Sequence, residues 1–524
     1  MDAEIELKLF FEPQHQNALI TILDSLPECE PKGLKRLSNG YFDTPDLTLR
    51  RWDMGLRVRG FDGHREQTIK TAGRVVGGIH SRPEYNVTIE QDFPTLALFP
   101  AEIWPKGSDI EQAQSELACV FNTDFARRCW HVQVEGSRVE VALDIGQIRA
   151  GSEGHYRTEA LCELEFELLS GKPDALLMLA SRVANSVPLR LGKASKAQRG
   201  YRLAAQSSPL MLEALDFIAL PKDCDLTQAF ASVLETGIER WQLIEAMIAD
   251  SVIPQALQTN AQQASFESSE DAAQTSRLND LALPALWTRL RACIRLLKLT
   301  LNQFGVLSET NAAMFAEIEQ QLAFIEPARA LSHLLQQQKA MVQKHCDGNA
   351  LIEAIEAQYQ AYDFADKLRA LWAHLGYGQL QLSLVTLLHK VTHGEVRLDI
   401  QGSVAELSDA LQQSSWEKII ALMPVERDLT SHDYQAVATA LDESILVGFT
   451  YGALYSPKLR DQFRAPWLDL VLGIQTLMSY QALASIADNL GLDLTQWLDD
   501  KTSSLLNAME YSRKSALTAT PYWQ

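Results

Sequence analysis

The feature that most restricts the fold of this chain is a repeated alternation of charged and apolar residues in its first 205 positions. Residues 163–168 (ELEFEL) carry a carboxylate at every second position, and residues 4–8 (EIELK) have the same period. Successive side chains of a strand point to opposite faces, so each segment has one charged and one apolar face. If helices and loops cover the apolar faces from outside, the charged faces must meet inside a closed barrel.

Further strand-like segments bring charges with the same alternation: Arg57, Arg59, Lys70, Arg82, Glu140 and Asp144. Carboxylates about 6.6 Å apart along one strand repel one another unless a cation lies among them. Oxygen ligands without Cys or His clusters favour Mg²⁺ or Mn²⁺ over zinc. Several Arg and Lys side chains facing the same space favour a polyanion with phosphate groups. A metal and cationic clamps around a phosphate chain indicate phosphoryl transfer, with water as the acceptor.

The chain of 524 residues is too long for one ordinary core, and its texture changes near residues 206–209 (QSSP). Before that point it predicts strands with a few helices. Beyond it, apolar residues at i, i+3, i+4 and i+7 predict helices at 226–249, 286–304, 311–343, 352–374 and 434–455. The polar segment 258–279 is predicted to be a disordered loop. We therefore expect an α+β protein of two domains, 1–205 and 211–524, the second an all-α helical bundle.

Charge and composition limit the partners. Residues 1–205 hold 25 basic and 29 acidic side chains, so the remainder carries a net charge of −16 out of −20. Such an acidic half repels polyanions at long range, which argues against nucleic-acid binding. The N-terminus does not resemble a signal peptide, and charges interrupt the apolar runs before the ~20 residues of a membrane span. We expect a soluble, cytoplasmic protein with no membrane contact.

Residues 1–205 resemble the CYTH superfamily, the triphosphate tunnel metalloenzymes. The resemblance rests on eight motifs in order: E-x-E-x-K at Glu4, Glu6 and Lys8; Y-F-D-T-P at Tyr41 to Pro45; L-R-x-R at Leu56 to Arg59; T-x-K at Thr68 to Lys70; R-x-E at Arg82 and Glu84; D-x-G-x-I-x-A-G at Asp144 to Gly151; E-x-E-L at Glu165 to Leu168; and S-K-x-x-R-G-Y at Ser195 to Tyr201. Each motif is weak alone, but the ordered set is specific.

The resemblance implies an eight-stranded antiparallel tunnel with flanking helices that hydrolyses inorganic triphosphate to diphosphate and phosphate with Mg²⁺ or Mn²⁺. The implied metal ligands are Glu4, Glu6, Asp144, Glu163, Glu165 and Glu167. The implied phosphate ligands are Lys8, Arg57, Arg59, Lys70, Arg82, Arg127, Lys196 and Arg199. No separate catalytic base is assigned, and the Tyr41 to Pro45 segment is interpreted as a turn that positions a strand.

Three functions stay open on this fold. The first is an inorganic triphosphatase, whose substrate is triphosphate or another small polyphosphate. The second is an adenylyl cyclase or a thiamine-triphosphate hydrolase. The third is a polyphosphate sensor without catalysis, against which the complete carboxylate set argues, since anion binding alone would not need Glu163, Glu165 and Glu167 together.

The C-terminal half resembles a CHAD domain, whose signature is a histidine followed by arginines at helical spacing, once in each half. One copy keeps the basic stripe Arg291, Arg295 and Lys298, but has Thr288 where the histidine would align. The second copy keeps His432, but has Gln435, Thr439, Ala440 and Asp442 at positions that are usually basic. We expect that this half has lost most polyanion binding and serves as a stabilising module or as an interaction module for a protein partner.

Overall fold

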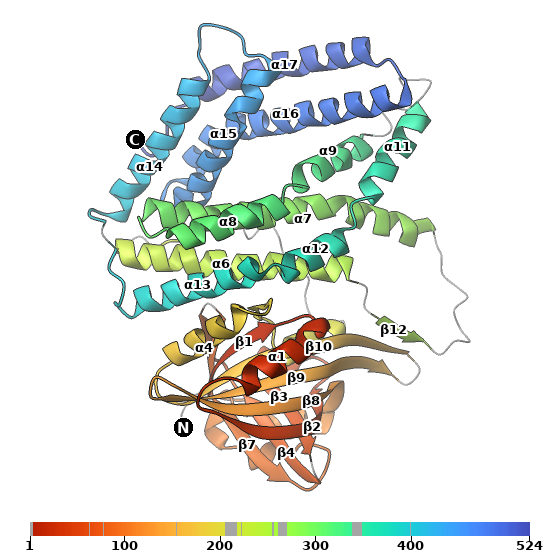
Figure 1. The fold of residues 1–524 in the computed structure, drawn as a ribbon, viewed down its shortest axis with the longest axis vertical. Coiled ribbons are helices and arrows are strands. Elements are labelled where there is room, and N and C mark those ends of the chain that lie inside the picture. Colours follow the sequence, from red (N-terminus) through yellow and green to blue (C-terminus); the bar gives the residue numbers. More distant parts are fainter. Residues whose placement is uncertain are drawn as a thin grey trace. The chain divides into compact units, whose positions relative to one another are not determined.

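The computed structural model describes residues 4–61, 63–76, 78–152, 155–204, 217–221, 223–253, 256–259, 270–337, 348–398 and 400–524. The chain divides into two compact units. Unit 1 comprises Met1–Leu210, Ile253–Ser268 and Arg369–His389, and unit 2 comprises Met211–Val252, Ser269–Leu368 and Lys390–Gln524. Strands come first along the chain and helices follow, which confirms the predicted fold class (Figure 1). The predicted boundary at 206–209 lies outside the described residues.

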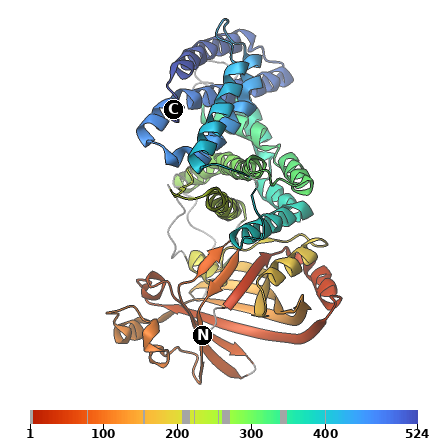
Figure 2. The same cartoon turned by 90° about the vertical axis from the view of Figure 1, so that its left-hand side faces the viewer.

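Unit 1 is built around one antiparallel sheet with the strand order β5-β6-β1-β10-β9-β8-β2-β3-β4-β7, to which β11 adds beside β1 and β12 beside β10. The strands are β1 Glu4–Phe10, β2 Cys29–Asp43, β3 Gly55–Phe61, β4 His64–Lys70, β5 Arg74–Val76, β6 Ile79–Arg82, β7 Glu84–Ile89, β8 Ala118–Val134, β9 Ser137–Ser152, β10 His155–Ser170, β11 Arg190–Leu191 and β12 Ala256–Thr259. Figure 2 shows how the long strands bend.

The sheet is closed by one segment of chain that is interrupted at Pro83. Before this proline, β6 pairs with β1, and after it β7 pairs with β4, so the segment joins both ends of the strand order. Proline has no N–H to donate to a ladder, which explains why the pairing changes partner here. The sequence predicted eight strands. The twelve strands assigned within the described part of the chain reduce to these eight if β6 and β7 count as one and the short β5, β11 and β12 are set aside.

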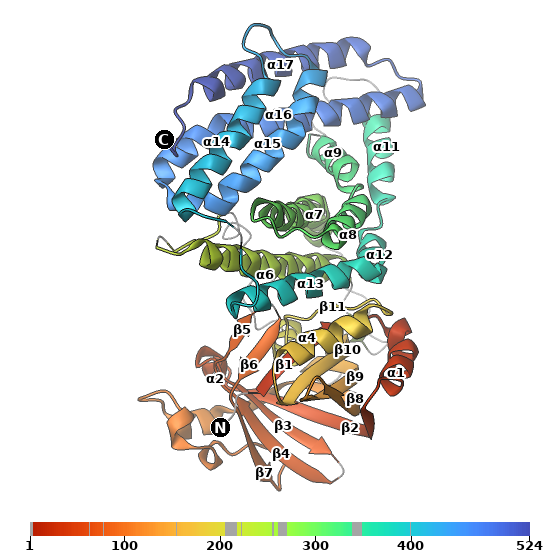
Figure 3. The ribbon, with the colours of Figure 1, turned by 60° about the vertical axis from the view of Figure 1, so that its left-hand side comes forward.

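The apolar faces of the strands turn outward beneath helices and loops. Leu7, Leu9, Leu164 and Phe166 are fully buried. Helix α4 (Asp174–Ala184) lies across β1, β9 and β10, with α1 (Gln16–Asp24) against it (Figure 3). Helices α2 (Thr48–Arg51) and α3 (Ile110–Glu116) border the core formed by β3 and β4. The charged faces are therefore left to line the interior.

Helix α5 (Lys196–Leu203) packs on the inner face of the sheet. Its Tyr201 joins Phe121 and Phe125 of β8 in a buried cluster. Residues 121, 125 and 127 share one strand parity, so α5 lies on the same face as Arg127. This placement brings the helix toward the charged interior.

Helix α13 (Leu375–Thr392) contributes to unit 1 as far as His389, which the sequence did not indicate. The Gln381 side chain accepts a hydrogen bond from the Leu191 backbone at 2.9 Å. His389 lies 2.6 Å from Asp174 of α4. Gly378 lies so close to Leu189 that a Cβ atom added to Gly378 would be 1.6 Å from the carbonyl oxygen of Leu189. Only glycine therefore fits at this position.

The other helices are α6 Leu226–Val252, α7 Glu270–Gln303, α8 Glu309–Gln321, α9 Ile325–Gln336, α11 Gly348–Gln360, α12 Phe364–Ala373, α14 Val404–Leu422, α15 Ser431–Tyr451, α16 Pro457–Leu490 and α17 Thr495–Thr518. Two predictions were wrong. The single helix expected at 311–343 is interrupted between α8 and α9, and the one at 352–374 is divided at Asp363, whose carboxylate accepts from the Asp366 N–H and starts α12. The predicted loop 258–279 includes the first turns of α7, and its residues 260–269 lie outside the described ranges.

Within the described residues, α16 alone has the length and apolar composition of a membrane span, with a mean hydropathy of 1.4 over its best window. Core helices of soluble proteins have the same properties. Phe463, Trp467 and Leu470 of α16 are buried in a core cluster of unit 2, together with Tyr434 of α15 and Met509 of α17.

Candidate functional site

Three buried carboxylates meet where β9 and β10 pair. Glu163 lies opposite Asp144 in the antiparallel register, and Glu165 is two residues further along β10 on the same face. Asp144, Glu163 and Glu165 are 0%, 0% and 9% exposed, and one oxygen of each lies within 4.8 Å of the others. We call these residues the acidic triad. An all-oxygen set at this spacing suits a hard divalent cation.

Lys196 of α5 bridges the whole acidic triad. Its Nζ lies 2.8 Å from Asp144, 2.7 Å from Glu163 and 2.9 Å from Glu165. Burial alone would lower the pKa of Lys196, but the three carboxylates raise it well above its usual value. The ammonium therefore stays charged in the interior.

Three more cations surround the triad. Lys8 donates to Glu165 at 2.7 Å, and Arg199 donates to Glu163 at 2.7 Å. Arg127 donates two hydrogen bonds to Asp144, at 2.7 and 2.6 Å, and a third to Glu165. Burial would raise the pKa of Glu165, but Lys196, Lys8 and Arg127 hold it well below its ordinary value. These cations neutralise the acidic triad locally.

The S-K-x-x-R-G-Y motif delivers two of these cations from one short helix. Ser195 and Gln198 form a capping box at the start of α5, so Lys196 and Arg199 lie about one turn apart on one side. Tyr201 donates to the buried Asp43 at 2.9 Å, and Asp43 also accepts from the backbone N–H of Leu49 and of Arg50 in α2. Asp43 therefore acts as a structural cap, in agreement with its interpretation as part of a turn.

A second charged group surrounds Lys70 on β4. Lys70 pairs with Glu4 of β1 and lies 2.8 Å from Glu84 of β7, which Arg57 also contacts at 3.3 Å. Burial raises the pKa of Glu4 to about 8, with Lys70 opposing the rise and Glu6 adding to it. Glu84 was not among the predicted site residues. Its spacing of two positions from Arg82 could have indicated it, because residues at this spacing in a strand share one face.

Glu6 and Glu167 belong to a third group, which we call the Glu6 row. In register across five strands lie His80, Glu6, Glu167, Glu140 and His131. Burial and then the charge of Glu140 raise the pKa of Glu167 to about 7. His131 contacts Glu140 at 3.0 Å. The six predicted metal ligands therefore lie in three places: the acidic triad, the Lys70 group with Glu4, and this row.

The remaining arginines have few acidic partners. Arg59 donates to the Asn39 side chain at 3.0 Å, and within the described ranges neither Arg59 nor Arg82 forms an ion pair. The Nε atoms of Arg57 and Arg82 are buried without a hydrogen-bond partner among the described residues. Burial and the nearby Arg57 and Arg127 lower the pKa of Arg59 to about 10. Such under-neutralised donors favour an anion.

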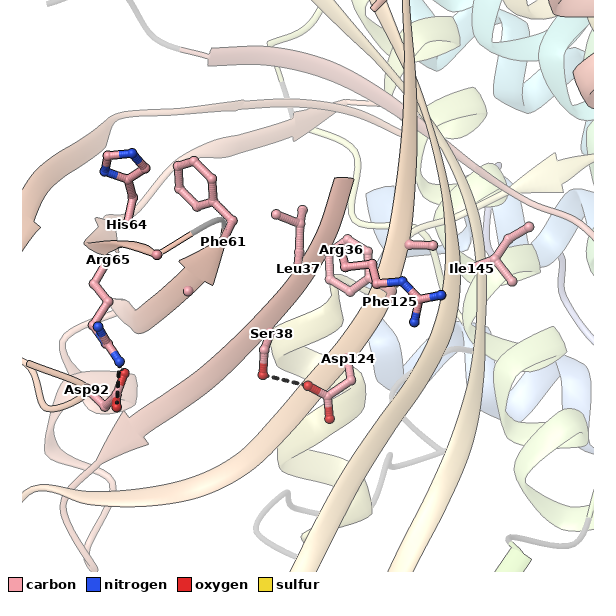
Figure 4. Close-up of a pocket in the computed structure, with 13 residues that line it drawn as sticks. Arg36, Leu37, Ser38, Phe61, His64, Arg65, Asp92, Asp124, Phe125 and Ile145 are labelled. Atoms are coloured by element: carbon pink, nitrogen blue, oxygen red, sulfur yellow. Dashed lines mark hydrogen bonds and ion pairs between the residues drawn. The ribbon is translucent and has the colours of Figure 1, made fainter. Parts of the chain in front are cut away.

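A hollow of about 690 Å³ opens between β2, β3, β4, β8 and β9 of unit 1, and Phe125 of the inner face is part of its lining. Figure 4 shows that Ser38 donates to Asp124 across part of it, at 2.6 Å, and that Arg65 pairs with Asp92. Its lining contains none of the predicted site residues. The concentration of buried charge identifies the charged part of the interior, rather than this hollow, as the candidate site.

Residues 2–201 match the family model of the CYTH domain, which confirms the resemblance found in the sequence. Over 208 residues the chain is 40% identical to an inorganic triphosphatase from Haemophilus influenzae. This match covers 39% of the present chain and 55% of the relative, so the chain spans about half the length of the curated relative it matches.

Two solved structures are similar in part. A CHAD domain from the plant Ricinus communis matches 58% of this chain and 95% of its own, with 14% identity and a TM-score of 0.40. A putative adenylyl cyclase from Hippeastrum with a dominant triphosphatase activity matches 38% of this chain and 95% of its own, with 18% identity and a TM-score of 0.28.

Proposed function

We propose that this protein hydrolyses inorganic triphosphate to diphosphate and phosphate inside the tunnel of unit 1, with a divalent metal ion. The observation that carries the proposal is the interior itself, where buried carboxylates share the space with Arg59 and Arg82, which form no ion pair among the described residues. The curated relative, an inorganic triphosphatase, supports the same chemistry. The substrate would be a compact polyanion because its binding groups are fixed cations.

Arg57, Arg59 and Arg82 are the binding groups for the phosphate chain. Their guanidinium forks match phosphate oxygens in two-point hydrogen bonds. Substrate would offer acceptors to the Nε atoms of Arg57 and Arg82, which have none among the described residues. Lys8, Lys70, Arg127, Lys196 and Arg199 already contact carboxylates, so their contribution is to keep the interior close to neutral until an anion and a cation enter together.

The carboxylates fit a hard cation, because they offer only oxygen atoms at close spacing. Glu4, Glu6, Asp144, Glu163, Glu165 and Glu167 are the residues that would hold Mg²⁺ or Mn²⁺. A bound metal ion would polarise the phosphoryl oxygens and lower the pKa of an attacking water. The arginines would meanwhile orient the terminal phosphate and stabilise its charge during transfer.

The two arginines of the basic stripe in unit 2 already contact carboxylates. Arg291 contacts Glu319 at 2.7 Å and Glu326 at 2.9 Å. Arg295 contacts Glu319 at 3.2 Å and Asp442 at 3.4 Å. Because acidic residues already neutralise these arginines, we propose a stabilising or protein-binding role for the helical part, and a cytoplasmic location for the whole.

Phosphate release from inorganic triphosphate, long-chain polyphosphate, ATP and thiamine triphosphate tests the proposal. We expect the highest kcat/KM with triphosphate, complete loss of turnover with a chelator, and recovery when Mg²⁺ or Mn²⁺ is added back. Equal or faster turnover of ATP or thiamine triphosphate would contradict the choice of substrate. Turnover that survives chelation would contradict the metal.

A further inference from the structure

His80 is a buried histidine whose function the site described so far leaves open. It is 3% exposed, and within the described chain its Nε2 atom has no hydrogen-bond partner. It lies directly opposite Glu6 in the β6–β1 register. Side chains of opposed residues share one face, with Cβ atoms about 4.5–5.5 Å apart. The imidazole therefore faces the charged interior beside the Glu6 carboxylate.

The environment of His80 defines its protonation. Burial, and then the positive charge of Lys8, lower its pKa to about 4, although a hydrogen bond with the Gly192 backbone partly opposes the shift. In a neutral imidazole one ring nitrogen carries a lone pair, and Nε2, which has no partner among the described residues, can present it to a ligand.

A lone pair of this kind selects its partner. The ring nitrogen cannot form a hydrogen bond with a deprotonated phosphate oxygen, because both atoms are acceptors. Its partner must be a metal cation or an N–H or O–H donor. Lys8, the nearby ammonium, is surrounded by carboxylates instead, with Nζ 2.7 Å from Glu165, 3.8 Å from Glu6 and 3.9 Å from Glu163. The other histidine of the row is engaged, since His131 Nε2 lies 3.0 Å from Glu140 and its Nδ1 lies 2.8 Å from Arg138.

The carboxylates of the Glu6 row have fewer close cations among the described residues than the acidic triad has, although Lys8 Nζ lies 3.8 Å from Glu6. Lys196, Arg127, Lys8 and Arg199 all contact the triad. Glu167, opposite Glu6, forms no ion pair within the described residues, and Glu140 repels it. A divalent ion in the Glu6 row would relieve this repulsion between carboxylates.

We propose that His80, through Nε2, supplies a nitrogen ligand to a divalent metal ion bound beside Glu6 in the tunnel. The inference rests on the proposed metal-dependent function and adds a ligand of a different chemical type to it. Imidazole suits transition metals, whereas Mg²⁺ keeps to oxygen ligands. The histidine should therefore shift the preference of the site toward Mn²⁺.

Pulsed electron paramagnetic resonance of Mn²⁺ bound to the full-length protein tests this directly, without reference to turnover. We expect echo modulation from a directly bound ¹⁴N nucleus in the wild type. The modulation should persist in His131→Gln, the matched control in the same row, and disappear in His80→Gln or His80→Asn. The Kd for Mn²⁺ should rise at least about tenfold in the His80 variants, because even the loss of a residue that only orients a metal ligand has an effect of this size. The Kd for Mg²⁺ should rise less.

Absence of nitrogen modulation in the wild type would overturn the inference, even if both His80 variants failed to fold. Its persistence in a folded His80 variant, or its loss in His131→Gln, would also overturn it. A protein that hydrolyses triphosphate with Mn²⁺ but shows no nitrogen coupling would refute only the His80 ligand. A protein that binds no Mn²⁺ and hydrolyses triphosphate in the presence of a chelator would refute the metal-dependent function as well.

Discussion

The Gln381 side-chain oxygen Oε1 accepts a hydrogen bond from the backbone N–H of Leu191 at 2.9 Å, across 190 positions of sequence. Leu191 pairs with Leu9 of β1, and the next residue, Gly192, donates to the carbonyl of Lys8 at 2.8 Å. The same segment continues into α5, which carries Lys196. Gln381 of α13 thus holds the backbone segment that pairs beside Lys8 and then leads into the helix of Lys196.

Gln381→Leu should destabilise the protein by about 1–3 kcal/mol, because it leaves the buried Leu191 N–H without an acceptor. Thermal unfolding measures the effect as a lower Tm. Gln379→Leu is the control, since Gln379 lies on the same helix and makes two longer bonds of 3.3 Å. If both variants lost the same stability, the Leu191 bond would not be the cause.

Lys196→Met should cost about 3–5 kcal/mol of stability, because the acidic triad would keep its buried negative charges without their shared cation. Triphosphate hydrolysis should fall with it. Chemical denaturation gives the free energy of unfolding, and Lys172→Met, at an exposed lysine of unit 1, is the control. Unchanged stability in Lys196→Met would show that the triad is neutralised without this lysine.

Arg59→Ala should lower kcat/KM for triphosphate by about 10- to 100-fold, the equivalent of a charged hydrogen bond of 1.5–3 kcal/mol. Its Tm should stay the same or rise, because burial and neighbouring arginines disfavour its charge. Steady-state kinetics and thermal unfolding separate the two effects. Arg65→Ala removes an arginine that pairs with Asp92 outside the charged interior and should change kcat/KM less than about twofold. Equal losses in the two variants would exclude a specific role for Arg59.

Glu167→Gln should stabilise the metal-free protein above pH 7 but not near pH 4.5. The folded-state pKa of Glu167 is raised to about 7 from an ordinary value of 4.5, so between these values the folded protein binds more protons than the unfolded chain. Its charge therefore lowers stability as pH rises through this window. Tm measured from pH 4.5 to 8 with a chelator should show a gap between variant and wild type that opens with pH. A gap independent of pH would contradict the shift.

Arg291→Ala with Arg295→Ala should leave the affinity of the full-length protein for long-chain polyphosphate within about twofold at 0.15 M salt, because Glu319, Glu326 and Asp442 already neutralise both arginines. Calorimetric titration measures the Kd. The double variant Arg57→Ala with Arg59→Ala removes the same number of charges from unit 1 and should raise this Kd strongly. If the helical variant lost binding instead, the basic stripe would be a polyanion site.

The sequence predicted much of the tunnel because strand alternation is local. The parity of residues along a strand assigns Glu6, Lys8, Arg57 and Glu165 to charged faces without any knowledge of the fold. The points at which long helices are interrupted were harder to predict from the sequence. The apolar period continues through 361–363, and only the capping contact of Asp363 with α12 shows the break.

The sequence by itself determined which side chains face inward, since the period of two is a property of each strand. Tertiary structure decided which of them meet, because pairing register depends on turns, bulges and the Pro83 change of partner. Register gathered Asp144, Glu163 and Glu165 under Lys196, placed Glu4 with Lys70, and set His80 opposite Glu6. Packing also brought α13 into unit 1, since burial of a helix against a strand segment some 190 positions away has no local signal in the chain.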